Sequence, residues 1–376
     1  MAVALGVDVG TTAVKCALVD ATTRALLASA YETTGEYVDC GVGRAEQSVD
    51  AILRAVHVAL AKLPQETLRV ISSVGICGQE FLATCRDRID AAHAVEGTGG
   101  GGTASSGLSS GYGLATFAHT LTTNPEGLAG YDACGTIHDL LAFILCGHAR
   151  VDEATIDTTD ASLGIPLEML PQVKPPGSVI GRTAEHSPFG IPPHVRVFVP
   201  MGDHPCSVVA AVAQLEVVNF GTSAQLAMIL PQRVAEGVPP TRGFEIRPFL
   251  TDDQVLGVAA ALSGGNMFAW LVRRCHEWMA ELAGDVSGSV PTKEATAATA
   301  SLCRGLVRNL VDMVPEDLHS HLRTSRVIGT GTALVRNALL QHFLSQELDD
   351  NANLRLQDAA DAAVGAALVP MRLNVL

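Results

Sequence analysis

The sequence predicts an α/β protein with two domains. Segments that read as short apolar strands alternate with segments of helical spacing along most of the chain, and this alternation is typical of α/β architectures. The chain has 376 residues, which is enough for two hydrophobic cores of ordinary size. A strand-turn-strand pattern near the start of the chain returns in its second half. We therefore expect one domain over residues 1–193 and a second over residues 194–376.

The first half begins with a predicted hairpin that turns at Gly10-Thr11-Thr12. Period-two and apolar runs predict strands over residues 3–9, 13–19, 24–31 and 70–76. Helical spacing predicts helices over residues 48–63, 115–121 and 138–146. The stretch 97–113 is rich in Gly and Ser, so we expect a poorly packed surface segment over 97–110. Residues 171–176 read as a loop.

The second half repeats the alternation. A strand over 195–200 leads into a helix over 207–215, whose start is marked by Asp203 or His204 as cap and by Pro205 in the first turn. The stretch "VVNFGTSAQLAMIL" reads as strand, turn and strand. The remaining expected elements are a strand over 326–328, a loop over 329–332, and helices over 295–314, 333–344 and 358–369.

Composition limits the partners that this chain can have. The net charge of −14 disfavours nucleic acid and anionic membranes as partners. No apolar run approaches the ~20 residues needed to span a bilayer. The N-terminus has no basic stretch and reads as a strand rather than a signal peptide. The nine cysteines form no CxxC pair, which favours reduced thiols in a cytoplasmic protein.

The two strand-turn-strand patterns match each other closely. "VDVGTTA" at residues 7–13 and "VNFGTSA" at residues 218–224 are identical at four positions, and the alternative to a duplication is chance similarity between two hairpins. Such a turn presents backbone N–H groups and hydroxyls to one point, as a phosphate cradle does. The expected cradle residues are Gly10, Thr11, Thr12, Gly221, Thr222 and Ser223.

Asp8 stands just before the first turn, inside an apolar run. A carboxylate there could hold Mg²⁺, through water because Mg²⁺ keeps several of its waters. Lys15 could balance phosphate charge, and a solvated lysine at a strand end is the alternative.

Several longer stretches together resemble one known family. They are "GVDVGTTAVKCALVD", "YDACGTIHDLLAFILCG", "PGSVIGRT", "MGDHPCSVVAAV", "VNFGTSAQL", "GVAAALSGGNMFAWLV", "LCRGLVRNLVDMVP", "GTGTALVRN" and "DAAVGAALV". In this order they resemble the FGGY carbohydrate kinases of the actin-like ATPase superfamily. The resemblance implies two ribonuclease-H-like domains with an interdomain cleft that closes on ATP, Mg²⁺ and a small-molecule ketose. It implies transfer of the γ-phosphoryl group to the terminal hydroxyl of sedoheptulose, which gives sedoheptulose 7-phosphate.

The resemblance also assigns roles to residues. The catalytic base falls on Asp203, which would accept the sugar hydroxyl proton. A helix cap is the alternative reading of Asp203; the two roles can coexist, and we expect cap geometry to keep its carboxylate ionised. Residues implied for adenosine and its cleft are Gly329, Gly331, Thr332, Asn337, Gly264 and Gly265. Residues implied for the sugar are Gln79, Glu80 and Asp203.

The sequence departs from the family at the sugar site. The family's Trp-x-Asp-x-Arg motif is missing after "GICGQEF", and the only tryptophans are Trp270 and Trp278. Glu80 and Phe81 stand where the family usually has Met-His. An incomplete gene model, a kinase with another acceptor and a pseudokinase all remain open. A nucleotide-dependent interaction module is a further alternative, although the retained Asp203 argues against it. We expect nucleotide binding to survive better than ketose binding, and the oligomeric state is not predicted.

Overall fold

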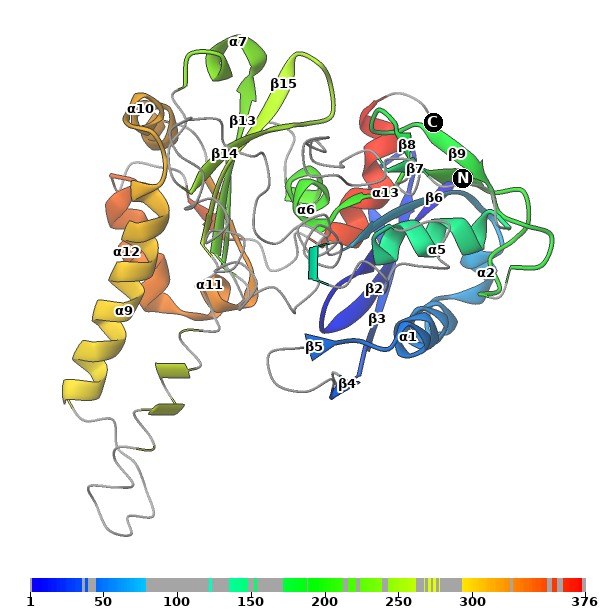
Figure 1. Cartoon of the computed structure of the whole chain (residues 1–376), viewed down its shortest axis with the longest axis horizontal. Coiled ribbons are helices and arrows are strands. Elements are labelled where there is room, and N and C mark those ends of the chain that lie inside the picture. Colours follow the sequence, from blue (N-terminus) through cyan, green and yellow to red (C-terminus); the bar gives the residue numbers. More distant parts are fainter. Residues whose placement is uncertain are drawn as a thin grey trace. The chain divides into compact units, whose positions relative to one another are not determined.

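The computed structural model of the chain divides into two units (Figure 1). They comprise Met1–Ala210 with Asp361–Leu376, and Ala211–Ala360. The structure describes residues 2–35, 38–39, 45–78, 122–123, 135–147, 152–153, 172–187, 189–211, 216–220, 224–238, 243–261, 267, 270–271, 273–274, 277, 293–324, 327–349, 354–356 and 361–373.

This division differs from the predicted boundary between residues 193 and 194. Strands β10 (Arg196–Phe198) and β11 (Met201–Gly202) both pair with β6 (Ile71–Gly78) of the first unit. Helix α13 (Ala362–Arg372) packs against the first strands of the chain rather than against the second unit. Residues 194–210 and the C-terminal segment therefore belong to the first unit.

The first unit is built on a seven-stranded sheet of order β3-β2-β1-β6-β10-β9, with β11 also beside β6. Strands β1 (Val3–Val9), β2 (Ala13–Asp20) and β3 (Leu26–Thr33) form an antiparallel meander, and β6 runs parallel to β1. The four predicted strands of this region are confirmed. Strand β9 (Val179–Arg182) at the edge was not predicted.

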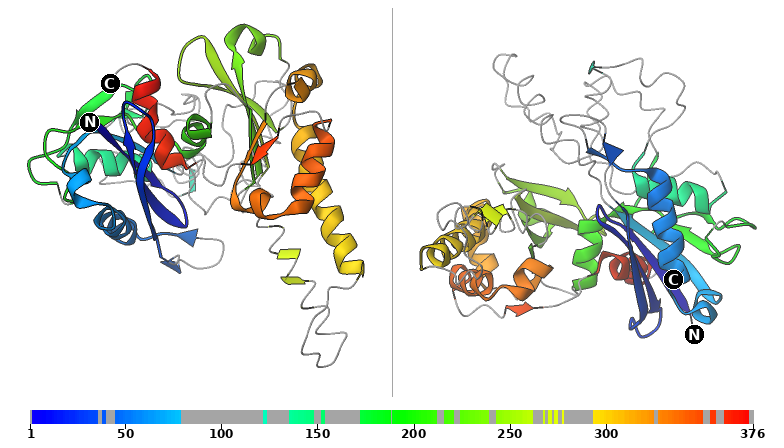
Figure 2. Two further views of the ribbon diagram at one scale, coloured as in Figure 1. Left: turned by 180° about the vertical axis from the view of Figure 1, so that it is seen from behind. Right: turned by 90° about the horizontal axis from the view of Figure 1, so that it is seen from below.

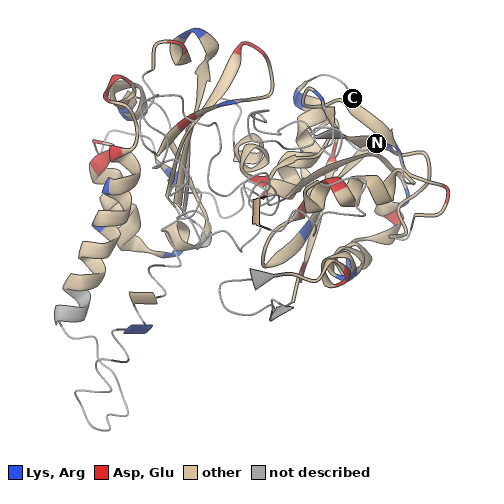
Figure 3. Cartoon of the chain, in the orientation of Figure 1, with Lys and Arg blue, Asp and Glu red and all other residues tan. Residues whose placement is uncertain are grey.

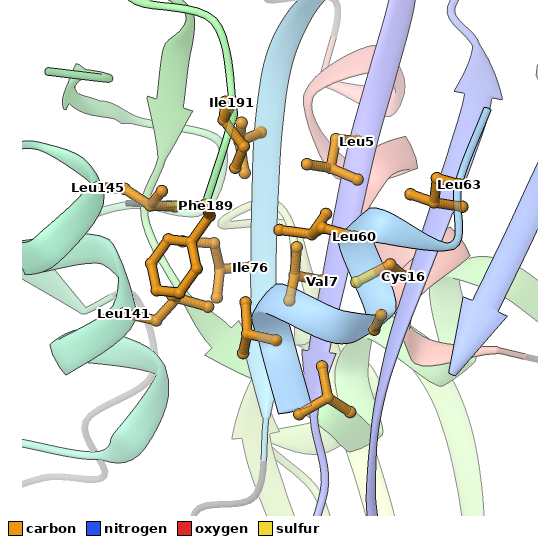
Figure 4. Packing of buried hydrophobic residues seen from close by; sticks show 14 of the residues in the cluster. Leu5, Val7, Cys16, Leu60, Leu63, Ile76, Leu141, Leu145, Phe189 and Ile191 are labelled. Atoms are coloured by element: carbon orange, nitrogen blue, oxygen red, sulfur yellow. The ribbon is translucent and has the colours of Figure 1, made fainter. Parts of the chain in front are cut away.

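Helices cover both faces of this sheet (Figure 2). Alternate side chains of β1 point to opposite faces. Leu5 and Val7 join the core under α1 (Val49–Ala61) and α5 (Ile137–Leu145), which Figure 4 shows from close by. Both helices were predicted, and the structure shows that Ser48 and Thr136 are their N-caps. Short α2 (Gln65–Leu68) follows α1.

Helix α13 lies unusually close to its neighbours on the other face. A Cβ on Gly6 would stand 1.7 Å from the Ala363 carbonyl oxygen, and one on Gly75 would stand 2.0 Å from that of Ala366. Gly6 and Gly75 are register partners in β1 and β6. A Cβ on Gly365 would stand 1.7 Å from the carbonyl oxygen of Cys206 in α6 (Asp203–Ala211). Only glycine fits at these three positions, because helix backbone occupies the space of a side chain.

The second unit repeats the strand pattern of the first. Its six-stranded sheet has the order β14-β15-β13-β12-β16-β17. Strand β12 (Glu216–Phe220) is antiparallel to β13 (Ala224–Pro231) and parallel to β16 (Val327–Thr330), as β1 is to β2 and β6. The shared topology supports a duplication over chance similarity. Strands β14 (Phe244–Pro248) and β15 (Gln254–Ala261) extend the sheet in the order β13-β15-β14 and were not predicted, and β17 (Arg355–Leu356) completes the sheet.

Helices of the second unit pack on its sheet around a separate core. They are α7 (Gln232–Ala235), α9 (Lys293–Asp312), α10 (Glu316–Thr324), α11 (Thr332–Arg336) and α12 (Ala338–Glu347). The prediction of one helix over 333–344 is wrong, because the extended backbone of Asn337 ends α11 and caps α12. Helix α10 was not predicted.

Two short pairs lie outside the main sheets, β4 (Val38–Asp39) with β5 (Ala45–Glu46) and β7 (Asp152–Glu153) with β8 (Gln172–Val173). Strand β8 falls inside the predicted loop 171–176. The predicted surface segment 97–110 and the predicted helix 115–121 lie outside the described residues.

Candidate active site

The first hairpin is held by contacts from outside its own strands. The Gly10 N–H donates to the Ala13 carbonyl at 3.1 Å, which closes the turn and engages one donor of the predicted cradle. The Thr11 carbonyl accepts hydrogen bonds from Gln47 Nε2 at 2.6 Å and from Thr34 Oγ1 at 2.7 Å. The predicted cradle residues Thr11 and Thr12 therefore lie on a turn whose backbone is held by side chains from outside the hairpin.

Asp8 is buried in β1, one position before the strand ends. Its side chain is 6% exposed, and its Oδ1 has no hydrogen-bond partner among the residues that the structure describes. Burial and the nearby Asp203 raise the pKa of Asp8 to about 8, while Lys15, its register partner in β2, lowers it. The strands around it carry few charges (Figure 3), so this carboxyl is costly where it stands.

The surroundings of Asp8 fit a magnesium ion. A buried carboxylate oxygen without a hydrogen-bond partner is what a cation would satisfy. In the described part of the chain, no group of three His, Cys, Asp or Glu side chains is arranged to hold a metal by itself. A single carboxylate such as that of Asp8 can suffice for Mg²⁺, which usually takes one or two carboxylates and fills its other positions with water and phosphate oxygens.

Asp203 begins α6, directly after β11. The register of β11 pairs Gly202 with Gly78, the last residue of β6, so Asp203 stands next to the end of β6, the strand that pairs with β1. Burial raises the pKa of Asp203, and the backbone N–H of His204 and the charges of His138 and Lys15 lower it. The backbone donors at the start of α6 favour the ionised form of Asp203, as expected of a cap, and burial opposes them and is the larger effect on its pKa.

Two groups near these carboxyls were not predicted from the sequence. His138 is fully buried in the first turn of α5, where a Cβ on Gly78 would stand 3.2 Å from its Nδ1. It occupies the apolar stripe that continues at Leu141 and Leu145, and a histidine in such a stripe is the signal that could have drawn attention to it. Asp361 caps α13 by accepting from the Ala363 N–H at 3.0 Å, and its charge raises the pKa of Asp8.

The predicted adenosine loop lies in the second unit. Gly331 has φ 87°, which favours glycine, and a Cβ on Gly329 would stand 2.8 Å from the Leu334 side chain. Thr332 is the first residue of α11. Asn337 Oδ1 accepts from the N–H groups of Leu339 and Leu340 at 3.0 and 3.2 Å, so this side chain caps α12. A role for Asn337 toward adenosine stays a prediction.

Several predicted site residues lie outside the described residues. They are Gln79, Glu80, Gly221, Thr222, Ser223, Gly264 and Gly265. The structure brings Asp8, Lys15 and Asp203 together within the first unit, and the predicted cleft between the domains stays a prediction. Among the described residues, no helix has the length and apolar character required to cross a membrane.

The first unit therefore combines the buried carboxyl of Asp8, the half-buried carboxyl of Asp203, a lysine and a backbone-anchored Gly-Thr-Thr turn. One carboxyl can hold a cation and the other can accept a proton, which are the two tasks of phosphoryl transfer to an alcohol. Together with two α/β units of repeated topology, this site defines a phosphotransferase of the actin-like ATPase superfamily.

Comparisons with known proteins identify the family. The chain is 31% identical to a sedoheptulokinase from Homo sapiens, with 99% of this chain and 98% of that protein covered, and 29% identical to one from Mus musculus. Structures with the same fold include a xylulose kinase from Rhodospirillum rubrum (TM-score 0.73, 16% identity, 97% of this chain and 88% of that one). Another is a Plasmodium falciparum glycerol kinase with ADP (TM-score 0.75, 14% identity, 100% and 90%).

The chain belongs to the FGGY family of carbohydrate kinases and is a phosphotransferase that acts on a sugar hydroxyl. No family model matches the sequence. The alignment with the human protein runs over 473 residues, whereas this chain has 376, so the relative carries segments without a counterpart here.

Proposed function

We propose that this protein transfers the γ-phosphoryl group of ATP to sedoheptulose with Mg²⁺ as cofactor, giving sedoheptulose 7-phosphate. The observation that carries the choice of acceptor is the likeness to sedoheptulokinases over nearly the whole of both chains. Sugar kinase activity itself follows from family membership. We place the protein in the cytoplasm, which agrees with the free thiols of all five cysteines that the structure describes.

Asp203 acts as the general base in this proposal. Its carboxylate accepts the proton of the terminal sugar hydroxyl as that oxygen attacks the γ-phosphorus in line. The burial that raises the pKa of Asp203 also makes its ionised form a stronger base, which suits proton transfer near neutral pH. The start of α6 fixes the position of the carboxylate relative to β6.

Asp8 and the first hairpin hold the nucleotide phosphates. Asp8 would hold magnesium through water, and when bound the ion neutralises charge on the β- and γ-phosphates. Thr11, Thr12 and Lys15 donate to phosphate oxygens, and Gly10 sets the turn. Gly221, Thr222 and Ser223 of the second predicted hairpin would also bind phosphate oxygens. Gly264, Gly265, Gly329, Gly331, Thr332 and Asn337 line the adenosine site.

A panel of acceptors tests this function. Sedoheptulose, ribulose, xylulose and glycerol are each assayed with MgATP for release of ADP and for formation of sugar phosphate. We expect the largest kcat/KM with sedoheptulose. A higher kcat/KM for another acceptor would assign a different substrate within the family.

A second candidate is a nucleotide-binding pseudokinase. The missing Trp-x-Asp-x-Arg motif favours it, as do the segments of the human relative that have no counterpart in this chain. Lost sugar contacts would reduce turnover as well as affinity, because binding energy at remote groups aligns the reacting ones. ADP release that no sugar stimulates, together with retained MgATP binding, would establish this candidate instead.

A further inference from the structure

We propose that Thr34 and Gln47 are positioning residues of the phosphate hairpin: they hold the Thr11 carbonyl so that the Thr12 N–H is aimed at the nucleotide. The inference rests on the proposed function, since it assigns these residues to the binding of ATP phosphates. Neither residue belongs to the hairpin itself. Thr34 follows β3, and Gln47 directly precedes Ser48, the N-cap of α1.

The contacts form a small closed network. Thr34 Oγ1 and Gln47 Nε2 both donate to the Thr11 carbonyl oxygen, at 2.7 and 2.6 Å, and Gln47 Nε2 lies 3.2 Å from Thr34 Oγ1. The Thr34 N–H also donates to the Thr12 carbonyl at 3.1 Å. Thr34 is 2% exposed, so its hydroxyl is shielded from water. Two consecutive peptide units of the turn are thereby fixed from the same side.

The hydrogen bonds to the Thr11 carbonyl also fix the direction of the Thr12 N–H. The Thr11 carbonyl and the Thr12 N–H belong to one planar peptide unit, and in a trans unit they point in opposite directions. The described part of the chain contains no cis peptide bond. Since the Thr11 oxygen points toward Thr34 and Gln47, the Thr12 N–H points away from them.

Thr12 is exposed, and its N–H donates to no acceptor within the described part of the chain. An exposed, aimed N–H on the turn that follows the strand of Asp8 is suited to a phosphate oxygen, because a preorganised donor needs no rearrangement when charge arrives. Without Thr34 and Gln47 the peptide unit could rotate, and part of the binding energy would be spent on ordering it. We call Thr34 and Gln47, with their hydrogen bonds to the Thr11 carbonyl, the brace. The brace therefore affects binding of the nucleotide phosphates and not binding of adenosine or the sugar.

Matched variants separate this role from general stability. Thr34→Val removes the hydroxyl donor at nearly constant shape, Thr34→Ser keeps it, and Gln47→Leu removes the amide donor. Ser48→Ala is the control, because it removes the α1 cap one residue from Gln47 without removing either donor to Thr11. Calorimetry measures binding of MgADP, a non-hydrolysable MgATP analogue and adenosine to the full chain.

We expect Thr34→Val and Gln47→Leu each to weaken binding of the ATP analogue about fivefold, the scale of one net hydrogen bond. The double variant should lose about thirtyfold or more. Adenosine binding should stay unchanged, and Thr34→Ser and Ser48→Ala should bind like the wild type. Equal losses in Ser48→Ala, or losses for adenosine as large as for the analogue, would overturn the assignment.

A second readout does not depend on nucleotide binding. In the ¹⁵N-labelled protein without ligand, the Thr12 amide resonance should shift or broaden in Thr34→Val and Gln47→Leu and stay in place in Ser48→Ala. An unchanged Thr12 amide in both brace variants would refute the inference. If the wild type binds no phosphorylated nucleotide, the proposed function fails, and the amide resonance still decides whether the brace exists.

Discussion

Replacing Gly365 by alanine should separate α13 from α6 and displace the proposed base. The new Cβ would stand 1.7 Å from the Cys206 carbonyl oxygen and 2.5 Å from its carbon, and real contacts under 3.0 Å essentially never occur. The two helices must therefore move apart by roughly 1.3 Å before that contact becomes tolerable. The obstacle is backbone, so no side-chain rotation can relieve it.

The magnitude follows from two opposing effects. Overpacking of this kind costs about 1–3 kcal/mol and occasionally more. Alanine in a helix raises the free energy of unfolding by about 0.5–1 kcal/mol relative to glycine. We expect a net loss of about 2 kcal/mol in the free energy of unfolding and, for a unit of this size, a Tm lowered by about 4–8 °C.

The effect on catalysis should exceed the effect on folding. Asp203 opens the helix that carries Cys206, so a shift of α6 moves the carboxylate. A misplacement of about 1 Å can cost about a hundredfold in rate. We expect kcat to fall by about ten- to a hundredfold at a temperature where the variant is still fully folded.

A matched control lies in the second unit. Gly305 is an exposed glycine of α9 with nothing within 4 Å of its missing Cβ. Gly305→Ala should therefore stabilise the protein by about 0.5–1 kcal/mol and leave kcat unchanged. Calorimetric unfolding and the coupled ADP assay measure both variants. A Gly365→Ala variant with wild-type Tm and kcat would refute the account of how α13 and α6 pack.

The remaining predictions concern the carboxyls and the ligands. Asp203→Asn should lower phosphoryl transfer by about two to four orders of magnitude while MgATP binding by calorimetry stays nearly unchanged, and a wild-type rate would rule out the base. Asp8 has a folded-state pKa of about 8, above its ordinary value of 3.8, so folding takes up a proton and stability in Mg²⁺-free buffer falls as pH rises between those values. Asp8→Asn should remove this dependence, raising Tm at pH 8 relative to wild type while abolishing Mg²⁺-dependent transfer; parallel Tm–pH curves for the two proteins would contradict it. Calorimetry should show MgATP binding in the micromolar-to-millimolar range and weaker binding of sedoheptulose, with ADP formed in excess of sugar phosphate. Tight sedoheptulose binding with one-to-one coupling would show that the sugar site is intact.

Local patterns predicted the elements whose formation depends on nearby residues. The β1–β2 hairpin follows from two apolar runs around Gly-Thr-Thr, and its repeat predicted β12 and β13. The break at Asn337 was missed because the apolar spacing continues across it, whereas the side chain caps a new helix there. Strands β14 and β15 were not predicted, although they extend the sheet of the second unit beyond β13.

The site residues also differ in whether a local sequence pattern could predict them. Asp8 could be singled out because a carboxylate inside an apolar strand is costly, and Asp203 because a family motif marks it. Thr34 and Gln47 reach Thr11 across 23 and 36 residues of sequence, so no local pattern connects them to the turn. The domain boundary was misplaced for the same reason, since the pairing of β10 and β11 with β6 is a long-range contact.

The return of the C-terminal segment to the first unit has a physical explanation in helix α13. Its glycine and alanines allow contact with β1 and β6 at Gly6 and Gly75, and with α6 at Gly365. β1 carries Asp8 and α6 carries Asp203. Because α13 contacts both β1 and α6, this one helix sets the distance between the two carboxyls. Asp361 adds its charge at the start of that helix and raises the pKa of Asp8. A site built from strands and helices far apart in sequence needs such a common contact, because its functional groups must be held in fixed relative positions.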